Sequence, residues 1–165
     1  MADTPSSFTL TSPAFHDGDT LPQAHVHDSA GGANRSPALR WSGAPAGTQA
    51  FAVTAYDPDA PTGSGWWHWV VYNLPADATG LPEGAGSADG GALPAGAKQG
   101  RTDFGSEGYG GAAPPPGDKP HRYVFTVHAL KSRIDVPADA TAAFVGFNLH
   151  FATLAKASVT ARYGR

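Results

Sequence analysis

The protein has 165 residues, and we predict a single domain over residues 1–165, because a chain of roughly 150 residues already buries about two thirds of its unfolded surface. A net charge of −3 with only 15% charged residues excludes a basic field of the kind that binds nucleic acid or anionic lipid. The absence of cysteine excludes disulfides, thiolate metal sites and cysteine nucleophiles.

The first ten residues are polar, carry Asp3 and contain no apolar segment behind a basic start. They therefore do not resemble a secretory signal, and no later run approaches the ~20 apolar residues that a membrane-spanning helix needs. Provided that the chain is complete, we predict a cytoplasmic protein without integral membrane association.

The first third of the chain has a short strand at 8–10, an irregular segment at 11–36 and a second short strand at 39–41. Within the irregular segment, His25 and His27 alternate beside Asp28, so two imidazoles on one face of an extended chain could hold zinc or copper. The other interpretation is a pair of solvated loop histidines. We favour the second, and predict no metal site and no cofactor.

Two strands with a shaped turn between them occupy residues 49–73, because apolar and polar residues alternate over 49–57 and again over 67–72. Prolines and glycines fix the turn that joins them. In a regular strand, His68 shares a face with Val70 and Tyr72 and points away from the neighbouring tryptophans, toward the loop that begins at Asp57. The pattern thus predicts that a carboxylate and an imidazole meet at this turn.

A connector of turns over 74–100 leads to the glycine- and proline-rich stretch at 108–117, which precedes His121 and another alternating strand at 124–130. Two separate loops therefore each deliver a histidine.

The period becomes helical over 139–157, and a closing strand is expected at 158–163. Phe144, Phe147, Phe151 and Leu154 form one stripe of this helix, which we expect to dock on the strands. The order of elements predicts a mainly β protein with one helix near the C-terminus.

The convergence of Asp57, His68 and His121 has two chemical interpretations. In the first, Asp57 orients one imidazole, the histidines donate N–H groups to a small anion, and Gly110 and Gly111 add backbone N–H groups. In the second, the histidines act as acid and base in a hydrolase or isomerase. No Gly-x-Ser-x-Gly nucleophile turn is present, so we predict a binding protein without catalytic residues.

Five motifs in order resemble the phosphatidylethanolamine-binding protein family, in its bacterial Raf kinase inhibitor-like (YbhB/YbcL-type) branch. The motifs are Ser36-Pro37-Ala38-Leu39-Arg40-Trp41, Pro45-Ala46-Gly47-Thr48, Asp57-Pro58-Asp59-Ala60-Pro61, Trp67-His68-Trp69 and His121-Arg122-Tyr123. The resemblance covers nearly the whole chain, and five motifs in this order are far more specific than any one of them.

The resemblance implies a sandwich of two antiparallel sheets with Greek-key links. It implies a pocket for phosphate, a phosphoethanolamine-like headgroup or a carboxylate, and a protein partner such as a kinase or protease. It also implies a homodimer, to which exposed aromatics such as Trp66 or those of the late helix could contribute. Carried over by motif, the pocket residues are Asp57, His68, Gly111, His121 and Tyr123.

The chain departs from the family pattern at three places: Ala112-Ala113 before the prolines, Trp67 where eukaryotic relatives often have a second histidine, and Arg101-Thr102-Asp103 in place of a more usual Asn-Asp pair. The first departure leaves the pocket rim, and hence the choice of ligand, open.

Overall fold

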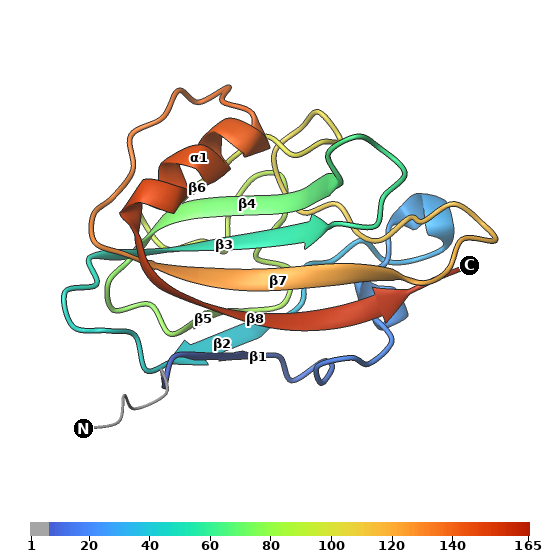
Figure 1. The fold of residues 1–165 in the computed structure, drawn as a ribbon, viewed down its shortest axis with the longest axis horizontal. Coiled ribbons are helices and arrows are strands. Elements are labelled where there is room, and N and C mark those ends of the chain that lie inside the picture. The colour runs from blue at the N-terminus through green and yellow to red at the C-terminus, as the bar shows by residue number, and fades with distance from the viewer. Residues whose placement is uncertain (1–6) are drawn as a thin grey trace.

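The computed structural model describes residues 7–165, and the start of the polar stretch used for the localisation prediction lies outside them. The chain forms two antiparallel sheets and one α-helix (Figure 1), which confirms the predicted fold class. The elements in chain order are β1 (Thr9–Thr11), η1 (Gln23–His25), η2 (Asp28–Ala30), β2 (Leu39–Ser42), β3 (Ala50–Asp57), β4 (Trp66–Pro75), β5 (Gly80–Leu81), β6 (Lys98–Gln99), β7 (His121–Leu130), α1 (Ala142–Ala152) and β8 (Thr153–Tyr163).

The larger sheet has the order β6-β4-β3-β7-β8, and the smaller one has the order β1-β2-β5. β3 and β4 are a hairpin, but β7 lies beside β3 only after a long connection through β5 and β6. This connection brings the start of β7 next to the end of β3, because the two strands are antiparallel.

The main core lies between the two sheets, where alternate residues of β3, β4 and β7 meet the inner side of the small sheet. A second core lies on the outer face of the large sheet, beneath α1. In Figure 1, α1 lies beside β4 at one end of the sheet and leaves much of β7 and β8 uncovered.

The prediction that the aromatic stripe docks the helix is wrong. The helix buries Ala142, Val145, Leu149 and Ala152, whereas the side chains of Phe147 and Phe151 are 62% and 61% exposed. Both stripes have the same spacing and lie on opposite sides of the helix, so periodicity alone could not select between them. The stripe that packs on the sheet contains three small or β-branched residues and Leu149, whereas the large aromatic rings lie on the exposed stripe.

The helix is also shorter, and the last strand longer, than predicted. Thr141 caps the helix by accepting a hydrogen bond from the Phe144 amide, and the helix ends at Ala152. β8 then begins at Thr153, because residues 153–157 pair with the far end of β7. Strand pairing therefore overrides the helical period in this segment.

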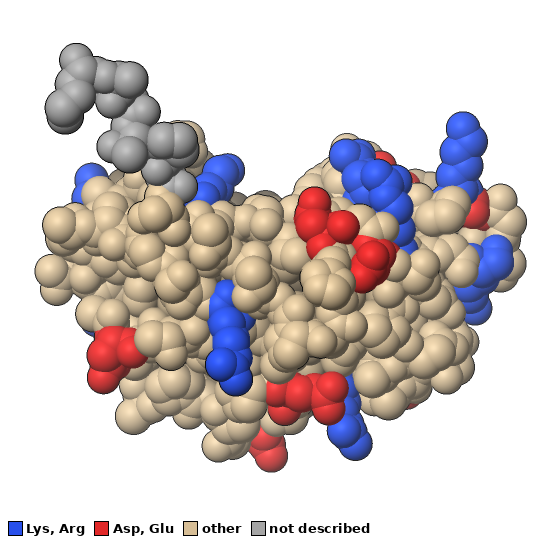
Figure 2. All heavy atoms as spheres, turned by 90° about the horizontal axis from the view of Figure 1, so that it is seen from below, with Lys and Arg blue, Asp and Glu red and all other residues tan. Residues whose placement is uncertain are grey.

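No helix within residues 7–165 is long and apolar enough to cross a bilayer. The face drawn in Figure 2 carries scattered, interspersed basic and acidic side chains, without a continuous basic band on that face. That nucleic acid is not a partner stays a prediction from the composition.

The docking of α1 gives a stability prediction. Leu149→Ala removes a side chain that is 2% exposed and should lower the free energy of unfolding by about 2–5 kcal/mol. Phe147→Ala removes a larger but exposed side chain and should change the free energy by less than about 1 kcal/mol. Urea unfolding of both variants measures the difference. An equal loss in Phe147→Ala would mean that the aromatic stripe is buried.

Candidate functional site

A cavity of about 240 Å³ opens at the end of the large sheet where β3 ends and β7 begins. Its walls are mostly apolar, with a few polar side chains on the inner side of the sheet. The lining residues are Asp57, Ala60, Pro61, Thr62, Trp66, His68, Phe104, Ala113, Pro114, Pro115, His121 and Tyr123. Four of the five predicted site residues therefore lie in one cavity, and Gly111 does not.

Asp57 is the last residue of β3 and is 2% exposed. Its Oδ1 accepts a hydrogen bond from the Asp59 amide at 2.8 Å, the turn that an Asp-Pro-Asp sequence favours. Its Oδ2 lies 2.7 Å from Nδ1 of His121. Both carboxylate oxygens thus have partners, and the carboxylate orients the imidazole as predicted.

A second carboxylate fixes the loop after β3 to the start of β7. Asp59 accepts two hydrogen bonds from the Arg122 guanidinium, at 2.9 and 2.8 Å, and a third from the Arg122 amide. The hydrogen bonds from Arg122 hold the pKa of Asp59 at about 2. We call these contacts the Asp59–Arg122 clamp. Because Asp57 and His121 are near neighbours of the two residues in sequence, the clamp holds their side chains close together where β3 ends and β7 begins.

His121 lies between two carboxylates. Nδ1 faces Asp57, and Nε2 lies 3.0 Å from Oδ2 of Asp118. Burial acts to lower the pKa of His121, but the hydrogen bonds with Asp57 and Asp118 outweigh it and raise this pKa above 6.5. Two carboxylate acceptors require an N–H at each ring nitrogen, so the geometry fits the charged imidazole.

A β-bulge places His68 in the cavity. Ala55 pairs with Trp69 and Tyr56 pairs with Trp67, so His68 is the extra residue of β4. The prediction that His68 shares a face with Val70 is therefore wrong, since Val70 belongs to the outer core and His68 lines the inner cavity. The bulge turns His68 to the same side as Trp69, while Trp67 faces the outer side.

The chain at Gly110 fixes the ring of His68. The Nδ1 atom donates to the Gly110 carbonyl at 2.7 Å, and the Gly110 amide donates to the His68 carbonyl at 2.9 Å. Burial lowers the pKa of His68 to about 4, although the carbonyls of Gly110 and Gly111 and the charge of Asp57 act in the opposite direction. His68 is therefore neutral at pH 7 with its proton on Nδ1, whereas His121 favours the charged form.

The prediction that the Gly110 and Gly111 amides face the ligand is wrong. The first donates to His68, and the second donates to Oδ1 of Asn34 at 2.7 Å. Glycine is needed at these positions for close packing: a Cβ would come within 2.3 Å of the Phe104 ring at Gly110, and within 2.5 Å of the His25 carbonyl at Gly111. Both residues support the cavity from behind it.

Aromatic rings complete the walls. The ring of Tyr123 lies edge-on to His68, with centroids 5.2 Å apart, and burial raises the pKa of its hydroxyl. Phe104 contacts both Trp66 and His68 edge-on, at 5.4 and 5.5 Å.

Asp118, which contacts His121, and Phe104, which lines the cavity, were not among the predicted site residues. The available signal for Asp118 was its place three residues before His121, in a Pro-Gly-Asp turn. Phe104 had no such signal, because its position depends on the tertiary path of a loop.

The segment with His25 and His27 does not form a metal clip in the structure. His25 is 1% exposed, and its Nδ1 bonds to the Arg35 carbonyl, so it is not a solvated loop histidine either. His27 stacks on Phe104 with centroids 5.0 Å apart. Among residues 7–165, no group of three or more histidines and carboxylates is arranged to hold a metal ion.

The contact between Asp118 and His121 predicts a pH-dependent contribution to stability. The pKa of His121 is higher in the folded protein than in the unfolded chain. The contribution to stability is therefore fully present below the unfolded pKa of about 6.5, and it is lost as the pH rises through the pKa of the folded protein. The difference in the free energy of unfolding between the wild type and Asp118→Asn should narrow over that window. Urea unfolding from pH 6 to 9 measures it, with exposed Asp135→Asn as the control of equal charge change. A difference that stays constant or widens would contradict the charged state of His121.

Comparison with known proteins agrees with this geometry. The model of the phosphatidylethanolamine-binding protein family matches residues 11–164. The Escherichia coli protein YbhB is 59% identical over 157 residues, covering 93% of this chain and 98% of that protein. The crystal structure of E. coli YbcL, described as a member of the mammalian PEBP family, has a TM-score of 0.93 at 53% identity, over 96% of this chain and 98% of that one.

A structure from Chlamydia trachomatis, CT736, described as a candidate homologue of the family, has a TM-score of 0.81 at 28% identity, over 97% of this chain and 99% of that one. A Mycobacterium tuberculosis relative, 39% identical over 133 residues that cover 81% of this chain and 60% of that protein, is named as a candidate lipoprotein, LppC. The cytoplasmic localisation of this chain stays a prediction. The family model and the relatives agree over nearly the full length, so the chain belongs to the phosphatidylethanolamine-binding protein family.

Proposed function

We propose that the cavity binds a small oxyanion, the phosphate or carboxylate group of a compact ligand such as phosphoethanolamine. The observation that carries the proposal is the imidazole of His121, which Asp57 orients and favours in its charged form at the wall of a mostly apolar cavity. A positively charged donor in such surroundings interacts strongly with an anion, because little water competes for it.

Asp118 occupies the position at which His121 would meet the anion. Its carboxylate contacts Nε2 of His121, and its side chain is 39% exposed. Because the side chain already lies partly in solvent, it can rotate away from His121. An entering oxyanion replaces one carboxylate by another anionic group at the same nitrogen. In the free protein, Asp118 therefore competes with the ligand.

His68 adds a preference for ligands that carry a proton. Because the Gly110 carbonyl engages Nδ1, a ligand meets the ring at Nε2, which is a hydrogen-bond acceptor when the ring is neutral. Hydrogen phosphate or a phosphomonoester monoanion can donate its own proton there. A fully ionised sulfate binds well only if His68 is protonated.

The size of the cavity sets an upper limit on the ligand. A volume of about 240 Å³ lies below the ~300–1,000 Å³ of sites for drug-sized molecules, so a headgroup fits inside and a lipid tail would remain outside. The name of the family supports a phosphoethanolamine headgroup as one candidate. Trp66, at the rim and half-buried, is where a protein partner such as a kinase or a protease would detect the bound ligand.

Binding is a better account of the lining than catalysis. Thr62 and Tyr123 are the hydroxyl-bearing side chains among the lining residues, and the Thr62 hydroxyl already donates to the Gly65 carbonyl at 2.5 Å. His121 has carboxylates at both nitrogens and favours the charged form, so it is poorly suited to act as a general base. These contacts support an anion receptor over a hydrolase or isomerase.

The proposal predicts saturable binding of phosphate, phosphoethanolamine or acetate in titration calorimetry. His68→Asn and His121→Asn preserve an N–H near the position of Nδ1 and remove Nε2, so each should weaken binding about tenfold to a hundredfold, the effect of one charge-assisted hydrogen bond. His16→Asn, which alters an exposed histidine outside the cavity, is the matched control. Unchanged affinity in both cavity variants would refute the proposal.

The affinity for sulfate should fall as the pH rises from 5.5 to 8.5. Sulfate keeps a constant charge over this range, and it favours protonated His68, whose pKa is about 4 in the free protein; bound sulfate raises this pKa, so proton uptake accompanies binding. Phosphate, which can supply a proton, should lose less affinity than sulfate over the same range. Affinity for sulfate that stays flat or rises would show that His68 takes up no proton when the anion binds.

A further inference from the structure

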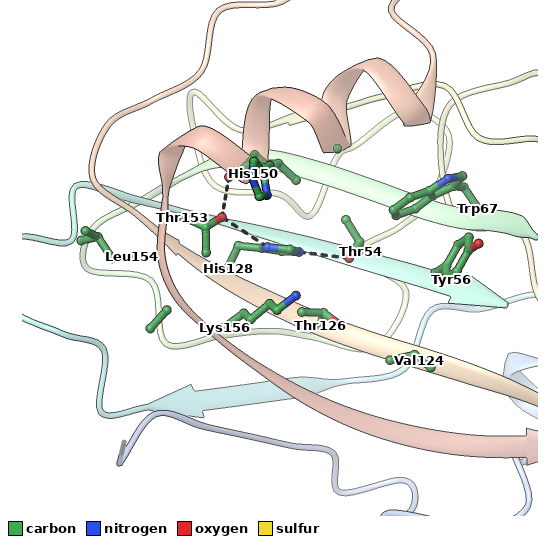
Figure 3. Close-up of a pocket in the computed structure, with 13 residues that line it drawn as sticks. Thr54, Tyr56, Trp67, Val124, Thr126, His128, His150, Thr153, Leu154 and Lys156 are labelled. Carbon is green, nitrogen blue, oxygen red and sulfur yellow. Dashed lines mark hydrogen bonds between the residues drawn. The ribbon is translucent and has the colours of Figure 1, made fainter. Parts of the chain in front are cut away.

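A second concave site lies on the opposite, outer face of the large sheet. Because α1 covers only one end of this face, a groove of about 600 Å³ remains between the helix and strands β3, β7 and β8 (Figure 3). Its lining residues are Thr54, Tyr56, Trp67, Val124, Thr126, His128, Gly146, Leu149, His150, Thr153, Leu154, Ala155 and Lys156. It shares no residue with the oxyanion cavity.

Lys156 supplies a positive charge to this groove. It pairs with His128 across β7 and β8, and in Figure 3 its side chain extends along the sheet face toward Thr126. No aspartate or glutamate lines the groove. Across residues 7–165, the Lys156 ammonium has no carboxylate within ion-pair distance, so its charge is available to a ligand.

His128 forms part of a hydrogen-bonded floor. Thr153 donates its hydroxyl proton to the Leu149 carbonyl at 2.6 Å and lies 3.5 Å from Nδ1 of His128, while Thr54 Oγ1 lies 3.3 Å from Nε2 (Figure 3). Because the Thr153 hydroxyl already donates its proton to the Leu149 carbonyl, it can only accept a hydrogen bond from His128. The ring proton of His128 therefore lies on Nδ1. Burial and the charge of Lys156 lower the pKa of His128 to about 4, so the ring is neutral at pH 7.

The walls of the groove are apolar and aromatic. The rings of Tyr56 and Trp67 contact each other with centroids 4.6 Å apart, Leu149 is buried at the base of the helix, and Leu154 is 44% exposed at the edge. A mostly apolar groove of this volume with a few polar groups is typical of a small-molecule site. Lys156 is the one lysine or arginine among the residues of 7–165 that line the groove, so the complementary ligand carries a negative charge.

We propose that this groove binds an amphipathic organic anion, a carboxylate with an apolar tail, whose charged group contacts Lys156 and whose tail lies against Trp67, Tyr56 and Leu154. The tail gains free energy by leaving water, at about 25 cal/mol per Å² of buried apolar surface. The carboxylate selects this site over other exposed apolar surface of the protein, because here Lys156 lines the same groove as the apolar walls.

Titration calorimetry with monomeric decanoate tests the proposal, with decylammonium and acetate as probes of charge and tail. Decanoate should bind saturably, and the other two should bind much more weakly. Lys156→Gln should weaken decanoate binding roughly fivefold to tenfold. Lys131→Gln, an equal charge change at an exposed site outside the groove, should leave it unchanged.

A further variant distinguishes binding in this groove from binding in the oxyanion cavity around His121. His68→Asn should leave decanoate affinity unchanged, since His68 lies on the inner side of the sheet. Loss of decanoate binding in His68→Asn would place the acid in the cavity and overturn the proposal. Equal effects of the two lysine variants, equal binding of decylammonium, or no decanoate binding would each overturn it as well.

Discussion

The buried contact between Asp57 and His121 is the interaction on which the site depends. Both side chains are almost fully buried, at 2% and 3% exposure, and a buried charge is costly unless it is paired and hydrogen-bonded. The fold meets this requirement by joining the end of β3 to the start of β7 with the Asp59–Arg122 clamp. A charged imidazole is thereby held in a mostly apolar cavity, where an anion would have few competitors other than Asp118.

The two histidines of the cavity differ in charge because their partners differ. His121 meets two carboxylates, which favour its charged form, whereas His68 meets a neutral carbonyl in a buried position, which favours its neutral form. One ring is thus a donor at Nε2 and the other is an acceptor at the same atom. For the anion binding that we propose, this asymmetry favours a partly protonated phosphate over a fully ionised anion.

Much of this arrangement could be predicted from the sequence. Alternation located the long strands, and ordered motifs brought Asp57, His68, His121 and Tyr123 to one site. Alternation failed at His68, because a bulge depends on the register of two strands and leaves no period of its own. It also failed at α1, where two equal apolar stripes compete. The roles of Gly110 and Gly111 were misjudged because close packing and ligand contact both call for glycine.

The tautomers of the two cavity histidines are the most direct test of their assigned charge states. Nitrogen-15 NMR of histidine-labelled protein near pH 7 distinguishes protonated from unprotonated ring nitrogens. We expect two N–H groups on His121 and a single N–H on His68, located at Nδ1. A neutral His121, or a His68 that carries its proton at Nε2, would contradict these assignments.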